Sequence, residues 1–367
     1  MAEAAATEAE GTLSAKAVDA LRRERLFWMC VPRELGGEGL GLTASIEIIE
    51  EITYADGSTG WTVMANMASA AIAAAFLGEA AVEAMFGGSE PPIAAGMLGP
   101  AGKCKARDGG YEAEGKFGFG SGMGHATWIG AGMLVMEEGG PRRLPSGLPE
   151  VQVCWVPRDR VEVLGNWNVS GLIGTGSFDY LVPRQFVPGA WSFERTTLEP
   201  KRGSQAFRLG VAGAASAGHA AVALGLTRRA LHECAIIADG KQRPGYVGPV
   251  AESHVFRHDF AEHEASYQGA RAYVLKAFGE AEEAALAGAP VTDEHRARLR
   301  QVNTWAHHVA SAAIGFAHRW AGSEALRWGT AINRVSRDMA AATQHVFVDE
   351  MTLVDAAPAL LRAWKAL

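Results

Sequence analysis

Two well-separated parts of this sequence carry the side chains best suited to chemistry. His345 follows Asp338 by seven residues, a spacing that puts both on one face of a helix, two turns apart. An imidazole exchanges protons near neutral pH, so His345 is a candidate acid or base. Ser121 lies in the glycine-rich string GKFGFGSGMGHATW, where its hydroxyl could donate and accept hydrogen bonds.

Each of these residues also has a purely structural interpretation. A lone histidine late in a helix is more often a core or capping group, and a serine among glycines can simply serve a turn. Phe119 precedes Ser121 by two residues, which predicts the same face of a strand, and it could pack on a ligand or only in the core. Trp167, in the loop GNWNVSG, could line a substrate cavity.

The loop ADGKQRPGYVG offers Lys241 and Arg243 as cations for a phosphate, although a solvated basic loop has the same composition. The four cysteines, at 30, 104, 154 and 234, are far apart and have no histidine at metal-ligand spacing, so we expect no metal site and no disulfide framework. Reduced thiols agree with a cytoplasmic protein.

The composition is that of an ordinary globular protein. The 367 residues are 48% hydrophobic and carry a formal net charge of −7. A mildly acidic chain without a basic block is a poor nucleic-acid binder. The first ten residues form an Ala/Glu-rich tail without a basic region, so we expect no signal peptide. The longest apolar stretch, 209–226, is interrupted by His219, which favours a buried helix over a membrane span.

The order of elements predicts three domains. Apolar residues recur at helical spacing between 12 and 88, and Thr43, Ser58 or Thr59 would begin helices there. Short apolar runs punctuated by Gly and Pro follow, with Gly109-Gly110 as a hairpin turn. Helical spacing returns from about 205, in a run rich in small residues that permit close packing, and the last clear helix is expected over 332–346. The predicted domains are 1–91 (helical), 92–204 (β) and 205–367 (helical bundle).

The sequence resembles the acyl-CoA dehydrogenase superfamily in three strings, in the same order and spacing over roughly residues 15–355. They are GYEAEGKFGFGSGMGHATWIGAG, GLIGTGSFDYLVPRQFVP and RVSRDMAAATQHVFVDE. The resemblance implies a mainly α fold with a central β domain: an N-terminal helical domain, a small β-barrel domain and a C-terminal four-helix bundle.

The third string indicates the branch. An acyl-CoA dehydrogenase often carries its catalytic glutamate about two turns after an Arg-Asp pair, whereas here His345 follows Arg337-Asp338. A histidine there is similar to the two-component monooxygenases, which use reduced flavin, FMN or FAD, supplied by a separate reductase. Phenol hydroxylases of that branch place a second histidine about two turns after the tryptophan corresponding to Trp61. Here Ser69 stands at that distance and Asn66 is the nearest polar neighbour, so a paired-histidine device is not evident.

The resemblance implies roles for particular residues. Ser121 would face the flavin N5 edge and, with His345, would be catalytic. Asn66, Ser69 and Trp167 would contact the substrate. The residues implied to bind the cofactor are Gly96, Met97, Phe119, Ser121, Lys241 and Arg243, the two cations reaching the flavin phosphate of a neighbouring subunit.

We therefore expect a flavin-dependent oxidoreductase, most like a monooxygenase that oxygenates an apolar cyclic or aromatic small molecule. One alternative is an acyl-CoA dehydrogenase that uses FAD, with Glu350 as its base if the last helix is shifted. A second is a non-catalytic partner subunit of the same fold. The superfamily builds its flavin site across a subunit boundary, which implies a homo-oligomer, a tetramer or a dimer of dimers, without membrane or nucleic-acid partners.

Overall fold

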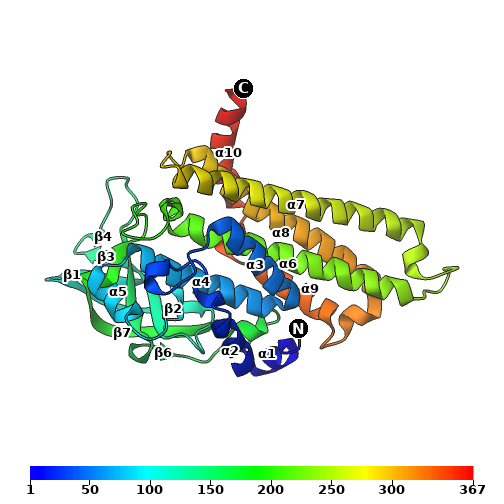
Figure 1. Ribbon diagram of the computed structural model, residues 1–367, viewed down its shortest axis with the longest axis horizontal. Coiled ribbons are helices and arrows are strands. Elements are labelled where there is room, and N and C mark those ends of the chain that lie inside the picture. The colour runs from blue at the N-terminus through cyan, green and yellow to red at the C-terminus, as the bar shows by residue number, and fades with distance from the viewer. Residues whose placement is uncertain (367) are drawn as a thin grey trace.

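The N-terminal part of the chain is helical, as the spacing of its apolar residues predicts. The computed structural model describes residues 1–366. The first helices are α1 (Ala4–Glu10), α2 (Ala15–Arg23), α3 (Leu42–Ala55), α4 (Gly57–Phe76) and α5 (Glu79–Phe86). Ile46 and Ile49 of α3 are fully buried, and α4 is buried over almost its whole length. Figure 1 shows α3 and α4 lying against the long helices of the C-terminal half.

The middle of the chain forms one mixed sheet of eight strands. They are β1 (Ala94–Arg107), β2 (Gly110–Gly120), β3 (Trp128–Glu137), β4 (Gly140–Pro141), β5 (Val151–Pro157), β6 (Glu162–Val163), β7 (Phe178–Pro188) and β8 (Ser192–Glu194). Seven of them follow the order β6-β7-β2-β1-β3-β5-β8, with β1 and β3 parallel and the other pairs antiparallel, and β4 pairs with β3. Over the described residues the sheet is therefore open, with β6 and β8 at its edges, rather than a closed barrel.

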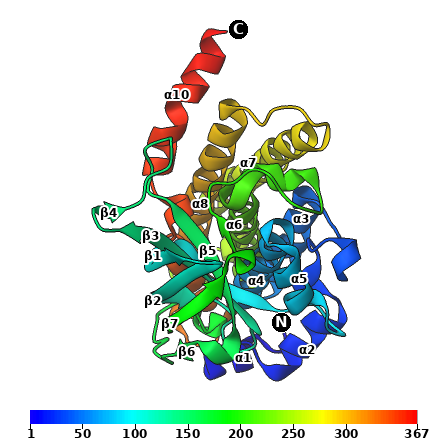
Figure 2. The same cartoon turned by 90° about the vertical axis from the view of Figure 1, so that its left-hand side faces the viewer.

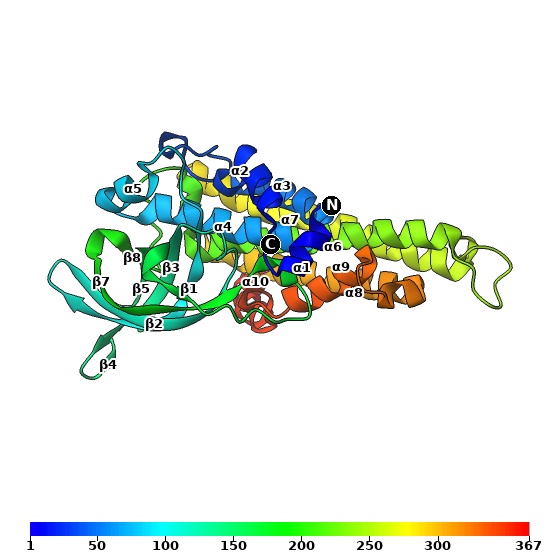
Figure 3. The same ribbon diagram turned by 90° about the horizontal axis from the view of Figure 1, so that it is seen from below.

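Long helices make up the C-terminal part. They are α6 (Gly210–Gly240), α7 (His254–Leu286), α8 (Asp293–Ala321), α9 (Ala331–Ala342) and α10 (Met351–Lys365). The sheet lies at one end of the molecule and α6, α7 and α8 extend away from it (Figure 3). The predicted fold class, helical at both ends with a central β region, is confirmed; the domain boundaries stay a prediction.

Small residues on α6 permit the close packing that the sequence predicts. A Cβ at Gly218 would lie 1.9 Å from Cγ of Met64 on α4, and one at Gly225 would lie 2.5 Å from Cβ of Thr53 on α3. Residues 205–240 are long and apolar enough to cross a membrane, but 83% of the most apolar window is buried within the protein. This helix therefore packs as the core helix of the bundle.

The starts of α3 and α4 differ from the sequence prediction, because the side chains that cap these helices lie outside the predicted positions. Helix α3 begins at Leu42, and its first N–H groups, including Leu42 N at 2.6 Å, donate to the carboxylate of Glu282 on α7. Helix α4 is capped by Asp56, whose Oδ2 accepts a hydrogen bond from Thr59 N at 2.9 Å. A carboxylate at a helix N-terminus satisfies otherwise unpaired donors.

The predicted N-terminal tail and hairpin turn are also wrong in detail. Residues 4–10 form α1, because Thr7 is buried and Glu8 makes ion pairs with Arg334 and Arg337 of α9. The hairpin turns at Asp108-Gly109, with Gly109 at a φ of +75°, while Gly110 already pairs in β2.

The last predicted helix ends earlier than expected. Helix α9 stops at Ala342, so His345 lies beyond it and not on the helical face of Asp338. Helix α10, which the sequence analysis did not anticipate, follows and projects from the body of the protein (Figures 1 and 2).

All four cysteines are free and buried. Burial raises the pKa of Cys30 and of Cys234 to about 12. These thiols are therefore protonated at neutral pH.

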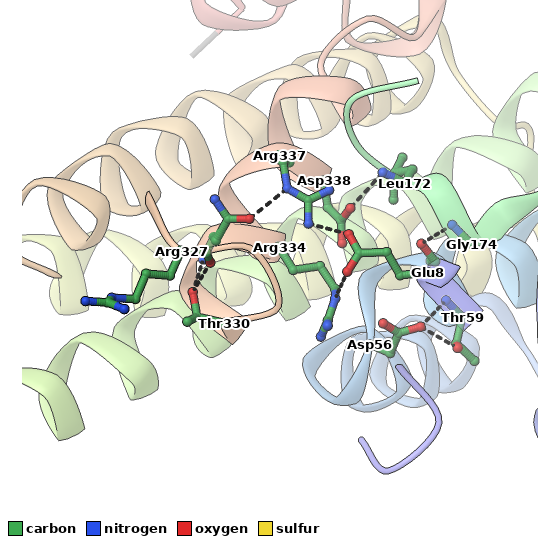
Figure 4. A network of polar contacts seen from close by, with 12 residues as sticks. Glu8, Asp56, Thr59, Leu172, Gly174, Arg327, Thr330, Arg334, Arg337 and Asp338 are labelled. Atoms are coloured by element: carbon green, nitrogen blue, oxygen red, sulfur yellow. Dashed lines mark hydrogen bonds and ion pairs between the residues drawn. The ribbon is translucent and has the colours of Figure 1, made fainter. Parts of the chain in front are cut away.

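Asp338 on α9 holds the loop between β6 and β7 in place (Figure 4). Its Oδ1 accepts a hydrogen bond from Leu172 N at 2.7 Å, and the neighbouring Arg337 donates to Ser170 O at 3.0 Å. On the other side of the loop, Gly174 N donates to Ser58 Oγ of α4 at 3.2 Å. The loop is thus fixed to both α9 and α4.

The environment of Asp338 opposes its ionisation. The side chain is 2% exposed and its Oδ2 has no hydrogen-bond partner. Burial, reinforced by the negative charge of nearby Asp56, raises the pKa of Asp338 from 3.8 to about 7. The carboxyl group therefore keeps its proton to a higher pH in the folded protein than in the unfolded chain.

We expect Asp338→Asn to flatten the pH dependence of stability. The raised pKa contributes stability below the unfolded value of 3.8, and this contribution is lost as the pH rises to about 7. One proton gives a slope of at most about 1.4 kcal/mol per pH unit. Asparagine retains an oxygen for Leu172 N–H and does not ionise. Urea unfolding between pH 4 and 8 should therefore lose this slope in Asp338→Asn and keep it in the exposed control Asp19→Asn; an unchanged slope in the first variant contradicts the assignment.

Candidate active site

Ser121 lies at the end of β2, in a row of buried polar side chains. Trp61 Nε1 of α4 donates to Ser121 Oγ at 3.1 Å, and Ser121 Oγ lies 2.7 Å from Ser177 Oγ. Ser177 Oγ lies 2.7 Å from Thr175 Oγ1, which donates to Leu172 O at 2.8 Å. The loop that Asp338 holds thus supplies two of the three hydroxyl groups.

The two ends of this row fix the direction of every proton in it. The indole N–H can only donate and the carbonyl can only accept. Thr175 donates its only hydroxyl proton to Leu172 O, so it accepts a hydrogen bond from Ser177, and Ser177 accepts one from Ser121. Ser121 therefore donates to Ser177, accepts from Trp61, and retains one lone pair. Toward a ligand, its hydroxyl acts as a hydrogen-bond acceptor.

Asn66 of α4 holds the backbone on both sides of this site. Its Nδ2 donates to Ala94 O of β1 and to Ser121 O, both at 3.0 Å. Its Oδ1 lies 3.0 Å from Nε2 of His125, which donates because the amide N–H groups are already used. These hydrogen bonds use both polar atoms of the buried Asn66 side chain to position Ser121, and contact of Asn66 with a substrate stays a prediction.

Phe119 does not share a face with Ser121, contrary to the sequence prediction. Its φ is +62°, a conformation that non-glycine residues rarely adopt, and the pairing of β2 with β7 is irregular at this point. Phe119 is 66% exposed, whereas Ser121 is 8% exposed. The Phe119 ring meets the ring of Trp167 edge-on at 6.2 Å, and Trp167 Nε1 donates to Ile173 O at 3.0 Å. These two predicted residues form an aromatic pair next to Ser121.

His345 belongs to a group of three histidines, called here the imidazole cluster: His219 of α6, His307 of α8 and His345. The rings of His219 and His345 stack with centroids 3.9 Å apart. The Trp61 ring lies edge-on to both, at 5.0 and 5.8 Å. Trp61 therefore contacts the cluster with its ring and Ser121 with its N–H group.

Burial keeps the imidazole cluster neutral at physiological pH. It lowers the pKa of His307 and of His345 to about 4. The pKa of His219 falls well below its usual value, through burial and the repulsion it would feel from charged His345 and His307. His345 also caps the short helix after α9, because its Nδ1 accepts from Phe347 N at 3.2 Å.

His219 and His307 were not predicted from the sequence as site residues. The signal for His219 in the sequence is its position inside the longest apolar run, because burial of an imidazole is costly without hydrogen-bond partners. His307 sits in a His-His pair on α8, and its position in the core could not be distinguished from that of exposed His308 without the fold.

Glu350, the alternative base, lies away from the cluster. Its side chain is 73% exposed and pairs with His308 at 2.7 Å.

Three other residues predicted from the sequence lie on α4 and β1. Ser69 is buried on α4. Gly96 has a φ of +134°, and a Cβ there would lie 2.0 Å from Gly130 O. The N–H of Met97 donates to the hydroxyl of Tyr180 at 2.8 Å.

Lys241 and Arg243 lie beyond the end of α6, far from the sheet (Figure 1). Arg243 donates to Arg319 O and Trp320 O at 2.9 and 2.8 Å, so it caps the end of α8. Within one subunit neither cation is part of the Ser121 site. Among residues 1–366, His258, Asp259 and Glu262 bring three possible metal ligands together, but on a largely exposed part of α7 where such groups are common.

Comparison with known proteins places this chain among flavoproteins. The family model described as acyl-CoA dehydrogenase, N-terminal domain, matches residues 1–85, and the model described as acyl-CoA dehydrogenase, C-terminal domain, matches residues 217–350. An indole-3-acetate monooxygenase of Pseudomonas putida is 28% identical, over 94% of this chain and 86% of that protein.

One further relative and one solved structure resemble this chain. The oxygenase component of an FADH2-dependent resorcinol hydroxylase of Rhizobium sp. is 29% identical over 50% of this chain and 43% of that protein. The crystal structure of 3-HSA hydroxylase from Rhodococcus sp. RHA1 has the same fold, with a TM-score of 0.88 at 24% identity over 96% of this chain and 91% of that one. Since the two family models together match more than half of the chain, this protein belongs to the acyl-CoA dehydrogenase superfamily and is most like its two-component reduced-flavin monooxygenases.

Proposed function

We propose that this protein is the oxygenase component of a reduced-flavin monooxygenase that acts on an aromatic small molecule. The observation that carries the proposal is the placement of an acceptor hydroxyl, Ser121, next to a buried neutral imidazole cluster, with Trp61 in contact with both. The relatives named as indole-3-acetate monooxygenase and resorcinol hydroxylase support the reaction class and the aromatic substrate.

The residues at Ser121 fit a reduced flavin, FAD or FMN. A reduced flavin carries a proton on N5 and needs an acceptor there, whereas the N5 of an oxidised flavin needs a donor. Since Ser121 donates its proton to Ser177, its free lone pair can accept a hydrogen bond from N5–H of the reduced form. When bound, the flavin supplies the electrons for reducing O2, so that one oxygen atom can enter the substrate.

The chain itself contributes binding, orientation and proton handling. Ser121 and its hydroxyl row orient the flavin edge, and the Phe119–Trp167 pair offers an apolar surface beside it. With Nδ1 accepting from Phe347 N–H, neutral His345 carries its proton on Nε2 and can donate a hydrogen bond from Nε2–H to an oxygen atom of the substrate. The aromatic rings around the cluster exclude water from it.

Two alternatives are less well supported. An acyl-CoA dehydrogenase needs a carboxylate base, and Glu350 is exposed and paired with His308. A non-catalytic partner subunit would not need the oriented hydroxyl row, and it would bind no flavin. Flavin binding therefore separates the partner subunit from both enzymes.

The proposal includes a separate flavin reductase and a cytoplasmic location. It also includes a homo-oligomer in which Lys241 reaches the flavin phosphate of a neighbouring subunit. Arg243 is a weaker candidate for that role because it already caps α8.

We expect Ser121→Ala to weaken the binding of reduced flavin. Loss of one hydrogen bond of about 0.5–1.5 kcal/mol corresponds to a two- to twelvefold rise in Kd, measured by anaerobic titration with FADH2 and FMNH2. Ser177→Ala should narrow the preference for reduced over oxidised flavin, because the Ser121 proton is then free to turn toward N5. Ser45→Ala, which removes a buried hydroxyl of α3 that donates to Leu42 O, is the control. Wild-type affinity for reduced flavin in Ser121→Ala would refute this role.

We expect His345→Ala to lower kcat by about 10²–10⁴-fold while the Kd for flavin barely changes, since a positioned acid or base contributes that much. Glu350→Gln should retain nearly full activity. An imidazole in water would place the acid limb of the pH–rate profile near 6–7. The lowered pKa of His345 moves the expected acid limb to about 4, with activity falling as the imidazole gains a second proton. A variant Glu350→Gln that loses turnover while His345→Ala keeps it would favour the dehydrogenase.

We expect a homotetramer or a dimer of dimers by light scattering. Val354, Leu361 and Trp364 are 59, 60 and 72% exposed and form one stripe along the projecting α10. Replacing Leu361 and Trp364 together by Glu should lower the mass toward that of a monomer, because a charge at a buried contact is costly. Arg362→Glu, outside the stripe, should leave the mass unchanged. A wild-type protein that is strictly monomeric with flavin bound would refute the assembly.

A further inference from the structure

Three polar atoms around the imidazole cluster are buried without a hydrogen-bond partner. They are Nδ1 of His219, Nε2 of His307 and Oδ1 of Asn303. The residues are 4, 2 and 0% exposed and come from α6 and α8. Buried polar groups in native proteins nearly always have partners. Three such atoms in one neighbourhood therefore indicate a place where a ligand supplies the missing hydrogen bonds.

The backbone fixes the tautomer of His307. Its Nδ1 lies 2.8 Å from Asn303 O, and a carbonyl oxygen can only accept, so Nδ1 carries the proton. The Nε2 atom of the neutral ring is then a bare lone pair. His307 thus presents a hydrogen-bond acceptor that is buried and unused.

His345 has the opposite tautomer. Phe347 N–H donates to its Nδ1, so the neutral ring carries its proton on Nε2 and presents a donor. Asn303 of α8 is bonded to the segment after α9, because its Nδ2 donates to Phe347 O at 2.8 Å. Its Oδ1 is left as a second unused acceptor. The cluster therefore offers acceptors from α8 and a donor from the segment after α9.

Within residues 1–366, the rings that pack on His219 carry no formal charge for an ionic ligand group. The rings packed on His219 are those of Trp61, His345 and Phe347. The neighbouring His308 pairs with Glu350 on the exposed side of α8. A carboxylate placed at the cluster would be desolvated without a cation, which is costly, whereas an uncharged O–H or N–H group would satisfy an acceptor.

We propose that the imidazole cluster binds an uncharged O–H or N–H group attached to the aromatic ring of the substrate, with His307 Nε2 accepting its hydrogen bond. Where the group is a hydroxyl, His345 Nε2–H donates back to its oxygen. His307 thereby takes the place of the second histidine that α4 lacks, at a different position in the fold. This inference rests on the proposed function and specifies its substrate class.

The test compares pairs of probes in which a methyl group replaces that proton in the second member. Phenol is paired with anisole, and indole with 1-methylindole, each titrated by ligand-observed NMR into the FADH2-saturated protein without O2. In the wild type we expect the proton-bearing member to bind about tenfold more tightly or better, the effect of leaving a buried acceptor unpaired. Equal affinities within a pair, or no binding of either member, would overturn the proposal.

Two substitutions at His307 separate its two nitrogen atoms. His307→Asn keeps a donor for Asn303 O but removes the Nε2 acceptor, so the preference within each pair should fall to about one. His307→Gln keeps an acceptor near the Nε2 position and should retain much of the preference. His308→Asn, the exposed neighbour on α8, should bind like the wild type. A His307→Asn variant that still discriminates would overturn the proposal.

The same samples distinguish this inference from the proposed function. The Kd for FADH2 is measured before each probe titration, and we expect it to be unchanged in the His307 variants. A wild type that does not bind FADH2 refutes the proposed function. A wild type that binds FADH2 but treats both members of each pair alike refutes only the present inference.

Discussion

The hydrogen bond from Leu172 N–H to the buried carboxyl of Asp338 is the contact on which the site depends. It fixes the loop between β6 and β7, and that loop supplies Thr175 and Ser177 to the hydroxyl row. Because Thr175 donates back to Leu172 O, the anchored residue also sets the proton direction of the whole row. A carboxyl group far from Ser121 in sequence therefore helps to hold the carbonyl group that orients the Ser121 hydroxyl through the row.

The interior of the site is polar but uncharged. An indole N–H, three hydroxyl groups and three imidazoles meet there, and burial lowers the pKa of each imidazole in the cluster. Buried neutral groups cost much less than buried ions and need only hydrogen-bond partners. The protein thus supplies direction through tautomers and hydroxyl orientation, and leaves charge and redox chemistry to the molecules that it binds.

The sequence predicted the order of helices and strands well, because apolar periodicity is a local property. It also identified Ser121 and His345, which lie near each other through Trp61. It could not predict that Phe119 adopts a left-handed conformation or that Glu282 caps α3, since both depend on distant parts of the chain. The imidazole cluster could not be predicted for the same reason, because α6, α8 and the segment after α9 meet only in the folded protein.

The burial of the cysteines bears on how long such a catalyst survives. An enzyme that handles reduced flavin and O2 releases hydrogen peroxide whenever oxygen is reduced without a substrate. Peroxide oxidises thiolates that it can reach, and the four thiols here are buried, with the pKa of Cys30 and Cys234 raised to about 12. On the proposed function, the fold therefore shields its own sulfur from the by-product of its futile cycles, and oxidative ageing would begin elsewhere, at exposed methionines such as Met351.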